Sequence, residues 1–416
     1  MIAEIVAIGS ELVSGQSLDT NSQWLSRELA ALGIAVRYHT SLGDDLAENV
    51  AALRIATGRA GLVITSGGLG PTQDDLTREA LAALAGVPLV EDASSLAAIA
   101  ELFARRGRPM AERNRTQALR PEGSEVIPNG RGTAPGLWMP VGNSIVACLP
   151  GVPVELKAMF ADGLVPRLEP LGAGGQVIVH RKINLFGQGE SEVEARALDL
   201  TARDHRPEVG ITASKATISF RMIGEGATAA EAHAMLEPIA ATIYQRFGDL
   251  AVGEGDEDVV DALVKVLRAT RTTLAVAESC SGGRIASAIT GLADVSPIFL
   301  GGVVSYSNAS KTELLGVPAS LIESRGAVSP EVAEAMAVGA RRKFGADLAL
   351  SVTGVAGPGG GTEAKPVGLV YLGLATADGV ASRELRVGSD QPREVIQGRA
   401  AKYAMNWARR ALLGFS

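Results

Sequence analysis

A serine on a glycine-rich turn is the clearest candidate for covalent chemistry in this sequence. Ser279 lies in the segment Ala277-Glu278-Ser279-Cys280-Ser281-Gly282-Gly283, which follows an apolar run that predicts a strand and precedes a helix predicted from residue 284. A nucleophile on a strand-to-helix turn has backbone N–H groups and a helix dipole nearby that can stabilise an oxyanion. Hydroxyl residues at a helix start are more often simple caps, so the turn alone leaves both interpretations open.

A general base for this serine has to come from residues other than a local histidine. All four histidines precede residue 254, so the turn cannot form a Ser-His-Asp or Cys-His pair unless another domain or subunit donates one. The remaining bases are Lys311 or a carboxylate such as Glu278, and a lysine desolvated in a pocket can lose its proton near neutral pH. Tyr306 can relay that proton or hold the tetrahedral intermediate. Considered separately, Lys311 is more often a surface lysine and Tyr306 a packing aromatic.

Glycine turns and carboxylates also gather at the predicted strand ends of the N-terminal part. The segments are Gly9-Ser10-Glu11, Asp19-Thr20-Asn21 and residues 65–75, which include Gly67-Gly68-Leu69-Gly70-Pro71-Thr72. The glycines expose backbone N–H groups, and a helix predicted after Pro71, with Asp74 and Asp75 in its first turn, offers its positive end to a phosphate. These aspartates can simply complement the helix dipole. With Glu11 and Asp19, however, they predict a carboxylate cluster for a hard cation that bridges a diphosphate.

Alternating strand and helix patterns predict the elements that position these segments. Apolar runs predict strands over residues 4–8, 34–38 and 61–65, separated by helices with apolar residues at helical spacing. Such βαβ units form a largely parallel sheet, whose ligands bind at the carboxyl ends of the strands. A second set of strands is predicted over residues 272–277, 301–305, 347–352 and 367–376, and a final helix over 393–412.

Two glycine-rich breaks divide the chain into three predicted domains. Leu171-Gly172-Ala173-Gly174-Gly175 and Gly253-Glu254-Gly255-Asp256 give domains over residues 1–171, 172–253 and 254–416. The middle domain has strands predicted over 176–186 and 216–223 and a helix over 229–247, without a clear chemical motif. The predicted fold class is α/β, with two α/β domains of parallel or mixed sheets joined by a small α+β domain.

The composition of the 416 residues limits the classes of function. The net charge of −7 argues against a broad nucleic-acid footprint, although a local basic patch could still exist. Two cysteines without a CxxC or Cys/His cluster predict neither a disulfide framework nor a zinc site. The N-terminus lacks the basic region of a signal peptide, and no apolar run reaches membrane-spanning length. We therefore expect a soluble cytoplasmic protein.

The N-terminal segments resemble the molybdopterin-binding-type domain of the CinA family, the competence/damage-inducible proteins. Residues 7–12, 19–21, 67–75, 129–136 and 149–155 carry the resemblance, in that order. It implies a metal-dependent ADP-ribose pyrophosphatase, although molybdopterin adenylyltransferases share the fold, so the fold cannot choose between these chemistries. The expected ligands of the divalent cation (Mg, Mn or Co) are Glu11, Asp19, Asp74 and Asp75. The expected substrate-binding residues are Gly9, Ser10, Asn21, Gly67, Gly68, Gly70 and Thr72.

The C-terminal segments resemble the CinA C-terminal domain, which also occurs alone as nicotinamide mononucleotide deamidase. Residues 277–283, 301–311, 326–329, 351–361 and 363–368 carry this resemblance, with Ser281 where the family usually has threonine. By position, Ser279, Tyr306 and Lys311 match the family's catalytic serine, tyrosine and lysine. The expected substrate-binding residues are Glu278, Cys280, Ser281, Gly282, Gly283, Thr353, Gly354 and Gly357. Since no local histidine can activate Cys280, we expect it to be a packing or pocket residue.

The resemblance covers essentially the whole chain and implies a bifunctional pyridine-nucleotide salvage hydrolase. The C-terminal domain would convert nicotinamide mononucleotide to nicotinate mononucleotide and ammonia without a cofactor. The N-terminal domain would cleave ADP-ribose to AMP and ribose 5-phosphate. The expected partners are these nucleotides and a second copy in a homodimer, with no membrane and no direct nucleic-acid contact. Two alternatives stay open: a competence- or DNA-damage-related binding protein with vestigial pockets, and an N-terminal domain that handles molybdopterin.

Overall fold

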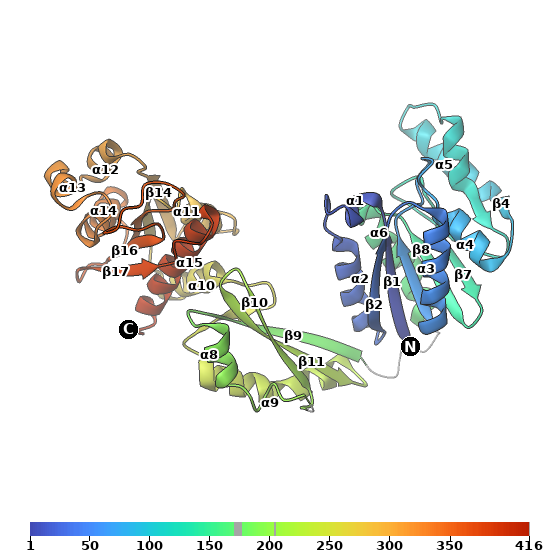
Figure 1. The fold of residues 1–416 in the computed structure, drawn as a ribbon, viewed down its shortest axis with the longest axis horizontal. Coiled ribbons are helices and arrows are strands. Elements are labelled where there is room, and N and C mark those ends of the chain that lie inside the picture. The colour runs from blue at the N-terminus through green and yellow to red at the C-terminus, as the bar shows by residue number, and fades with distance from the viewer. Residues whose placement is uncertain (170–176, 204, 416) are drawn as a thin grey trace. The chain divides into compact units, whose positions relative to one another are not determined.

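The computed structural model describes residues 1–169, 177–203 and 205–415. Contacts divide the chain into two compact units, Met1–Val179 with Gly224–Met235, and His180–Ile223 with Leu236–Ser416. Each sheet is described below by itself. The fold class is α/β, as predicted, with mixed sheets and a smaller α+β domain (Figure 1). The predicted linker over 171–175 lies outside the described residues.

A six-stranded sheet in the order β2-β1-β3-β8-β7-β6 forms the centre of the N-terminal domain. Neighbouring strands from β2 to β8 are parallel, whereas β7 and β6 run antiparallel to their neighbours. The alternating apolar runs therefore predicted the parallel part correctly. The strands are β1 Ile2–Ile8, β2 Ala35–Leu42, β3 Leu62–Ser66, β6 Glu125–Ile127, β7 Gly136–Val141 and β8 Ser144–Leu149.

Helices cover both faces of this sheet (Figure 1). Leu29 of α2 and Leu156 of α6 are buried in the core on one face, and Leu53 of α3 and Leu81 of α4 in the core on the other. A lobe beside the sheet pairs β4 with β5 and carries α5. The elements are α1 Ser10–Val13, α2 Thr20–Ala31, α3 Leu46–Arg59, α4 Thr77–Ala85, β4 Leu89–Glu91, α5 Ala93–Arg105, β5 Leu119–Pro121, α6 Pro153–Met159 and α7 Val165–Leu168, with a 3-10 helix over Glu112–Ala118 and a π-helical turn over Phe160–Leu164.

The α+β domain has an antiparallel hairpin within a four-stranded sheet of order β10-β11-β9-β12. Its long helix, α9, has the predicted bounds, whereas β10 was not predicted. The predicted break at 253–256 is wrong at its start, because Gly253 and Glu254 belong to a strand that pairs with β9. The elements are β9 Val177–Phe186, α8 Glu190–Ala195, β10 Glu208–Ser214, β11 Thr217–Gly226, α9 Ala229–Phe247 and β12 Ala251–Glu254.

The C-terminal domain contains a five-stranded sheet in the order β14-β13-β15-β16-β17. The strands β14, β13 and β15 are parallel, and β16 and β17 return antiparallel. Because β13 lies between β14 and β15, its carboxyl end is flanked by those of both neighbours. The elements are α10 Val259–Thr270, β13 Leu274–Glu278, α11 Arg284–Thr290, β14 Phe299–Val304, α12 Asn308–Leu315, α13 Ala319–Arg325, α14 Pro330–Phe344, β15 Leu348–Gly354, β16 Leu369–Ala375, β17 Val380–Arg386 and α15 Arg393–Leu412.

Among the described helices, none combines the length and the apolar character that crossing a bilayer would need.

Candidate active sites

The predicted nucleophile lies where β13 ends. The Ser279 N–H donates to the Val352 carbonyl of β15 at 2.9 Å, which fixes the turn to the neighbouring strand. Gly282 and Gly283 follow with φ of 65° and 93°, a conformation that glycine adopts without steric penalty, and α11 then begins. The N–H groups of Cys280 and Ser281 donate no hydrogen bond to another described residue. The turn therefore has two spare backbone donors directly after Ser279.

The side chain of Lys311, from α12, reaches this serine. Its Nζ lies 3.0 Å from Ser279 Oγ and donates to the Ser305 carbonyl at 2.8 Å. Lys311 is only 1% exposed, and burial lowers its pKa. A buried amine that touches a serine hydroxyl is the arrangement required of a lysine general base. The structure thus brings together two of the three predicted catalytic residues.

Glu278, the other predicted candidate base, is occupied elsewhere. Its carboxylate accepts the backbone N–H groups of Gly283, Ile285 and Ala286 at 2.9–3.1 Å. These are donors at the start of α11, so Glu278 anchors that helix as a buried cap. The structure therefore places Glu278 as a cap of α11, outside the lining of the Ser279 cavity, and its part as a base or substrate ligand stays a prediction.

Ser279 and Lys311 open into a cavity of about 180 Å³ at the carboxyl edge of the sheet. Tyr306 lies at its mouth, 62% exposed, and its hydroxyl accepts a hydrogen bond from Arg393 of α15 at 2.7 Å. Among the described residues, Tyr306 makes no hydrogen bond to Ser279 or Lys311. Arg393 also donates to the Gly357 carbonyl at 2.6 Å. Tyr306 and Arg393 therefore form a polar rim rather than part of the Ser–Lys contact.

The predicted substrate-binding residues of this domain divide into two groups. Cys280, Thr353 and Gly354 line the cavity, whereas Glu278, Ser281, Gly282, Gly283 and Gly357 are not among its lining residues. The Thr353 hydroxyl donates to the Ala327 carbonyl at 2.7 Å, which ties β15 to the loop that closes the cavity. Burial raises the pKa of the Cys280 thiol to about 12, so this cysteine is protonated and poorly nucleophilic at neutral pH.

Sequence reasoning missed several lining residues, of which Arg393 is the most informative. It is the first residue of α15, where a cation is disfavoured by the helix dipole. That unfavourable position was the available signal that the arginine serves something outside the helix. The other lining residues that were not predicted as site residues are Asn308, Ala327, Val328 and Ala356, which lie in segments that carry the family resemblance and supply amide, apolar and backbone surface.

The glycine loop of the N-terminal domain, residues 67–70, is held in place by hydrogen bonds that its carbonyl groups accept. Thr77 Oγ1 donates to the Gly67 carbonyl at 2.9 Å, and Arg78 donates to the Leu69 and Gly70 carbonyls at 2.7 Å each. Arg78 is 2% exposed, so this buried cation is committed to the loop. The N–H groups of Gly68 and Leu69 donate no bond to a described residue. With its carbonyls engaged and these donors spare, the loop can accept an anion.

Two glycines of this loop leave no room for a Cβ atom. A Cβ on Gly67, at φ 111°, would lie 2.1 Å from the Ile8 carbonyl oxygen, and one on Gly68, at φ 66°, would lie 2.2 Å from Thr77 Oγ1. Both values are far below any real contact distance. Glycine at these two positions of the loop therefore has a direct steric basis.

The predicted position of Asp74 and Asp75 in a helix is wrong, because α4 begins only at Thr77. The Asp75 carboxylate accepts the N–H groups of Gly70 and Thr72 at 2.7 and 2.8 Å and the Thr72 hydroxyl, which folds residues 70–75 into a turn. Asp74 remains exposed, and hydrogen bonding by the Thr72 hydroxyl and a backbone N–H lowers its pKa. Asp74 is thus ionised at neutral pH beside the loop.

The four predicted metal ligands do not come together as a cluster. Within the described residues, no three His, Cys, Asp or Glu side chains form a group that could hold an ion. Asp19 caps α2 by accepting the Ser22 N–H at 2.9 Å, Asp75 holds the loop turn, and Glu11 is exposed on α1. A cage of four carboxylates therefore does not fit these residues. The exposed carboxylate of Asp74, beside the glycine loop, does fit a Mg²⁺ ion that takes its other ligands from substrate phosphate and water.

The remaining predicted binding residues mostly hold the loops. Ser10 donates its hydroxyl and its N–H to Asp44 at 2.6 and 2.9 Å, and the Gly9 N–H donates to Leu42. Asn21 is buried, with its Nδ2 donating to Ser66 and to the Gly151 carbonyl, and its Oδ1 has no partner among the described residues. Asn21 thus joins the ends of β3 and β8, and its oxygen remains available.

Comparison with known proteins decides the family. Residues 4–170 match the family described as probable molybdopterin binding domain, residues 180–253 the damage-inducible protein CinA KH domain, and residues 256–412 the CinA C-terminal domain. A CinA-like protein of Rippkaea orientalis is 42% identical over 418 residues, which are 99% of this chain and 100% of the relative. The chain belongs to the CinA family. A putative competence-damage inducible protein of Symbiobacterium thermophilum is 43% identical and covers 100% of both chains. The predicted resemblance is confirmed.

Solved structures of CinA proteins match parts of the chain. A CinA protein of Thermoplasma acidophilum is 34% identical, covers 40% of this chain and 97% of its own, and gives a TM-score of 0.38. A competence/damage inducible protein of Agrobacterium tumefaciens is 36% identical, covers 37% of this chain and 93% of its own, and gives a TM-score of 0.36.

Proposed function

We propose that the C-terminal domain hydrolyses the carboxamide of nicotinamide mononucleotide to nicotinate mononucleotide and ammonia. One observation carries the proposal: the buried amine of Lys311 lies 3.0 Å from Ser279 Oγ inside a cavity. Burial lowers the pKa of Lys311, which favours the neutral amine that a base requires. The family resemblance supplies the substrate, and the pocket supplies the chemistry.

In this mechanism Ser279 Oγ attacks the carboxamide carbon while its proton passes to Lys311 Nζ. The oxygen that becomes negatively charged accepts hydrogen bonds from the spare N–H groups that follow Ser279. The protonated Lys311 then gives the proton to the amide nitrogen of the tetrahedral intermediate, the C–N bond breaks, and ammonia leaves as the ester of Ser279, the acyl-enzyme, forms. Water, deprotonated by the same amine, hydrolyses this ester and restores the Ser279 hydroxyl. Each proton removed is returned, so no co-reactant other than water is needed.

The rim of the cavity suits the charged end of the substrate. A space of about 180 Å³ accommodates the pyridine ring and its carboxamide but leaves the ribose and the phosphate outside. Arg393, held at the mouth by Tyr306 and the Gly357 carbonyl, is a cation in position to pair with that phosphate. Tyr306 accordingly orients Arg393 and borders the substrate, instead of relaying a proton.

Product analysis with the purified full-length protein tests this proposal. Nicotinamide mononucleotide should yield ammonia and nicotinate mononucleotide in equal amounts without added metal. Free nicotinamide, which lacks the phosphate for Arg393, should react far more slowly at equal concentration. Absence of ammonia release from the nucleotide, with the protein shown to be folded, would refute the assignment.

For the N-terminal domain we propose cleavage of a nucleoside diphosphate such as ADP-ribose to AMP and ribose 5-phosphate. The observation in favour is the glycine loop, whose carbonyls are held by Thr77 and Arg78 while the Gly68 and Leu69 N–H groups are spare. Asp74 would hold a divalent cation there, and such a cation would neutralise charge on the diphosphate. Release of AMP from ADP-ribose, measured with and without Mg²⁺, tests this second activity.

A further inference from the structure

A groove of about 520 Å³ lies between the α+β domain and the C-terminal domain, within the compact unit that contains both. One wall comes from α8 and the β10–β11 hairpin, and the other from the end of β17 and from α15. None of its lining residues belongs to the Ser279 cavity or to the glycine loop over 67–70. Neither proposed reaction uses this groove.

Three cationic side chains from different elements line the groove: Lys215 from the hairpin turn, Arg386 from β17 and Arg399 from α15. Within the described parts of the chain, the side chains of Lys215 and Arg399 form neither an ion pair nor a hydrogen bond. Arg399 is half-buried, where a cation without a partner has lost part of its hydration. Arg386 is paired with Glu384 at 2.7 Å. These residues together favour an anionic group in the groove.

The turn of the β10–β11 hairpin holds Lys215 in an uncommon backbone conformation. Lys215 and Ala216 have φ of 48° and 64°, in the left-handed region that two-residue hairpin turns usually fill with asparagine and glycine. Lys402 of α15 donates to the Lys215 carbonyl at 3.1 Å, and Ala216 packs against the core of the C-terminal domain. Backbone conformations of this kind persist where neighbouring groups impose them, and they gather at ligand sites. The turn therefore fixes the position from which Lys215 enters the groove.

Groups that can bind hydroxyls also line the groove. The Glu190 carboxylate of α8 has no partner among the described residues, and that of Glu192 accepts the Gly189 N–H at 3.2 Å. Tyr403 adds a hydroxyl without a described partner, while its ring packs against that of Phe186. A carboxylate is the group that holds ribose hydroxyls in dinucleotide-binding folds. Because carboxylates repel a bare phosphate, the groove suits an anion that also carries hydroxyl groups.

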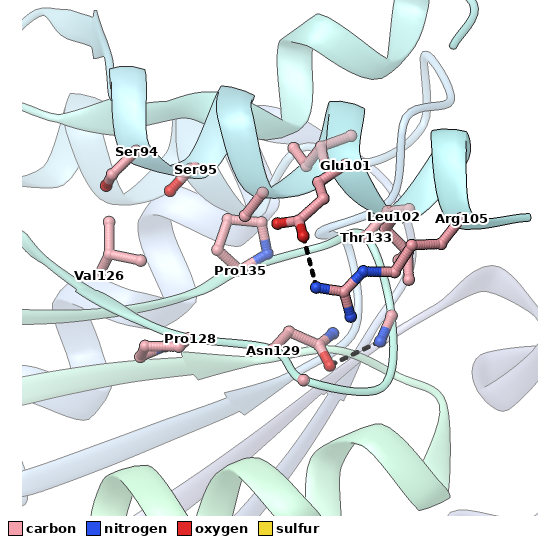
Figure 2. A pocket seen from close by; sticks show the side chains of 14 residues that line it. Ser94, Ser95, Glu101, Leu102, Arg105, Val126, Pro128, Asn129, Thr133 and Pro135 are labelled. Atoms are coloured by element: carbon pink, nitrogen blue, oxygen red, sulfur yellow. Dashed lines mark hydrogen bonds and ion pairs between the residues drawn. The ribbon is translucent and has the colours of Figure 1, made fainter. Parts of the chain in front are cut away.

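A cavity of about 370 Å³ between α5 and residues 126–135 of the N-terminal domain differs from the groove in its charges (Figure 2). Its charged lining residues are Glu101 and Arg105, which pair with each other at 2.5 Å. Their charges therefore compensate each other without a ligand. In the groove, by contrast, two cations and one carboxylate have no partner among the described residues.

We propose that the groove binds a sugar phosphate. The phosphate would lie against Lys215, Arg386 and Arg399, and the sugar hydroxyls against Glu190 and Glu192. Guanidinium groups hold phosphate oxygens by paired hydrogen bonds, and a volume of about 520 Å³ is typical of a small-molecule site. Since the ligand would contact both the α+β domain and the C-terminal domain, its binding would stabilise the contact between them.

Calorimetric titration of the full-length protein with ribose 5-phosphate, without added metal, tests the proposal. Arg399→Gln should weaken binding by about 10-fold or more, and Lys215→Gln by about 3- to 10-fold, because each removes a cation that contacts the phosphate. Lys343→Gln is the matched control, since it removes an exposed cation of α14 that does not line the groove. Circular dichroism should show that each variant keeps the fold of the parent.

A titration with inorganic phosphate tests the part of the sugar. The parent should bind ribose 5-phosphate about 10-fold more tightly than inorganic phosphate, because the hydroxyls add hydrogen bonds to carboxylates. Glu190→Gln weakens a hydroxyl acceptor and removes a repulsion on the phosphate, so this ratio of affinities should fall. Equal affinity of the parent for both ligands would overturn the sugar phosphate. Ribose 5-phosphate that does not bind, or that binds Arg399→Gln and Lys215→Gln as it binds the parent, would overturn the site itself.

Discussion

Two serines that stand two residues apart show how strongly a role depends on surroundings. Ser279 touches a buried amine and opens into a cavity, whereas the Ser281 hydroxyl is buried without a partner and away from that cavity. Their sequence context is nearly the same, and only the fold distinguishes them. The difference makes Ser281 a natural control for the proposed nucleophile.

We expect Ser279→Ala to abolish deamidation, because the acyl-enzyme cannot form without its hydroxyl. The loss in kcat should exceed the roughly 10²- to 10³-fold that follows removal of a single oxyanion donor. Ammonia release from nicotinamide mononucleotide measures it. Ser281→Ala should keep nearly full activity, as should Cys280→Ala. Near-parental activity in Ser279→Ala would disprove the assignment of Ser279 as the nucleophile and would make Cys280 the next candidate.

The role of Lys311 as a general base can be tested by substitutions that remove its amine or replace it with a group that stays protonated. Lys311→Met removes the amine at similar length and should abolish deamidation, and Lys311→Arg should not restore it, because a guanidinium stays protonated. In the parent, kcat/KM should rise with pH as Lys311 loses its proton, at a pH below the usual lysine pKa of about 10.4. An active Lys311→Arg variant with an unchanged pH profile would instead indicate that Lys311 only binds substrate.

The lowered pKa of Lys311 also predicts how stability depends on pH. Between the folded pKa and the unfolded value of 10.5, the unfolded chain binds more protons at this site than the folded chain. The contribution of Lys311 to the free energy of unfolding therefore becomes more favourable as pH rises through that window. Hydrogen exchange of β13 and α12 should show the parent gaining protection relative to Lys311→Met as the pH rises toward 10.5. If the difference in protection between the parent and Lys311→Met did not change with pH, the lowered pKa of Lys311 would be contradicted.

At the scale of elements, the sequence predicts those helices and strands whose positions are set by the periodicity of apolar residues. The central strands and the long helices α9 and α15 lie where their patterns place them, because buried runs and helical stripes are local signals. The start of α4 was mispredicted, since the Asp75 carboxylate turns back onto Gly70 and Thr72 and delays the helix. That contact depends on a loop geometry that no periodicity encodes.

The sequence likewise predicts some residues of the candidate sites and not others. Ser279 and Lys311 were found from residue type and family resemblance, although they are far apart in sequence. The predicted metal cluster is wrong, because carboxylates at one edge of a sheet can bind backbone N–H groups instead of a metal ion, as Asp19 and Asp75 do. Arg78 was missed because a buried arginine inside an apolar helix pattern is visible only when its carbonyl partners are known.

Arg78 provides a test of how α4 supports the glycine loop. Arg78→Lys keeps the charge, but a single ammonium replaces the fork that holds the Leu69 and Gly70 carbonyls. We expect kcat/KM for ADP-ribose to fall by about 10- to 100-fold, as for a lost hydrogen bond to a charged group. Deamidation should stay at the parental level, which serves as the folding control. An unaffected pyrophosphatase would show that the loop does not depend on these two bonds.

At the scale of the whole molecule, the two candidate sites belong to different compact units of one acidic chain. The glycine loop lies in Met1–Val179 and the Ser279 cavity in Leu236–Ser416. With a net charge of −7, the chain would need local groups to attract the proposed anionic nucleotides, namely the loop N–H groups at one site and Arg393 at the other. This separation predicts two activities that respond independently to mutation.

The independence can be tested with one substitution at each site and the pair combined. Asp74→Asn removes the exposed ionised carboxylate beside the glycine loop while keeping its size, so ADP-ribose cleavage and its dependence on Mg²⁺ should fall by about 10-fold or more. Ammonia release should be unchanged, and Ser279→Ala should give the reverse pattern. Because the sites share no residue, each activity of the double variant should equal that of the corresponding single variant. If Asp74→Asn lowered both activities in a folded protein, the two sites would be coupled and the assignment of one reaction to each domain would have to be abandoned.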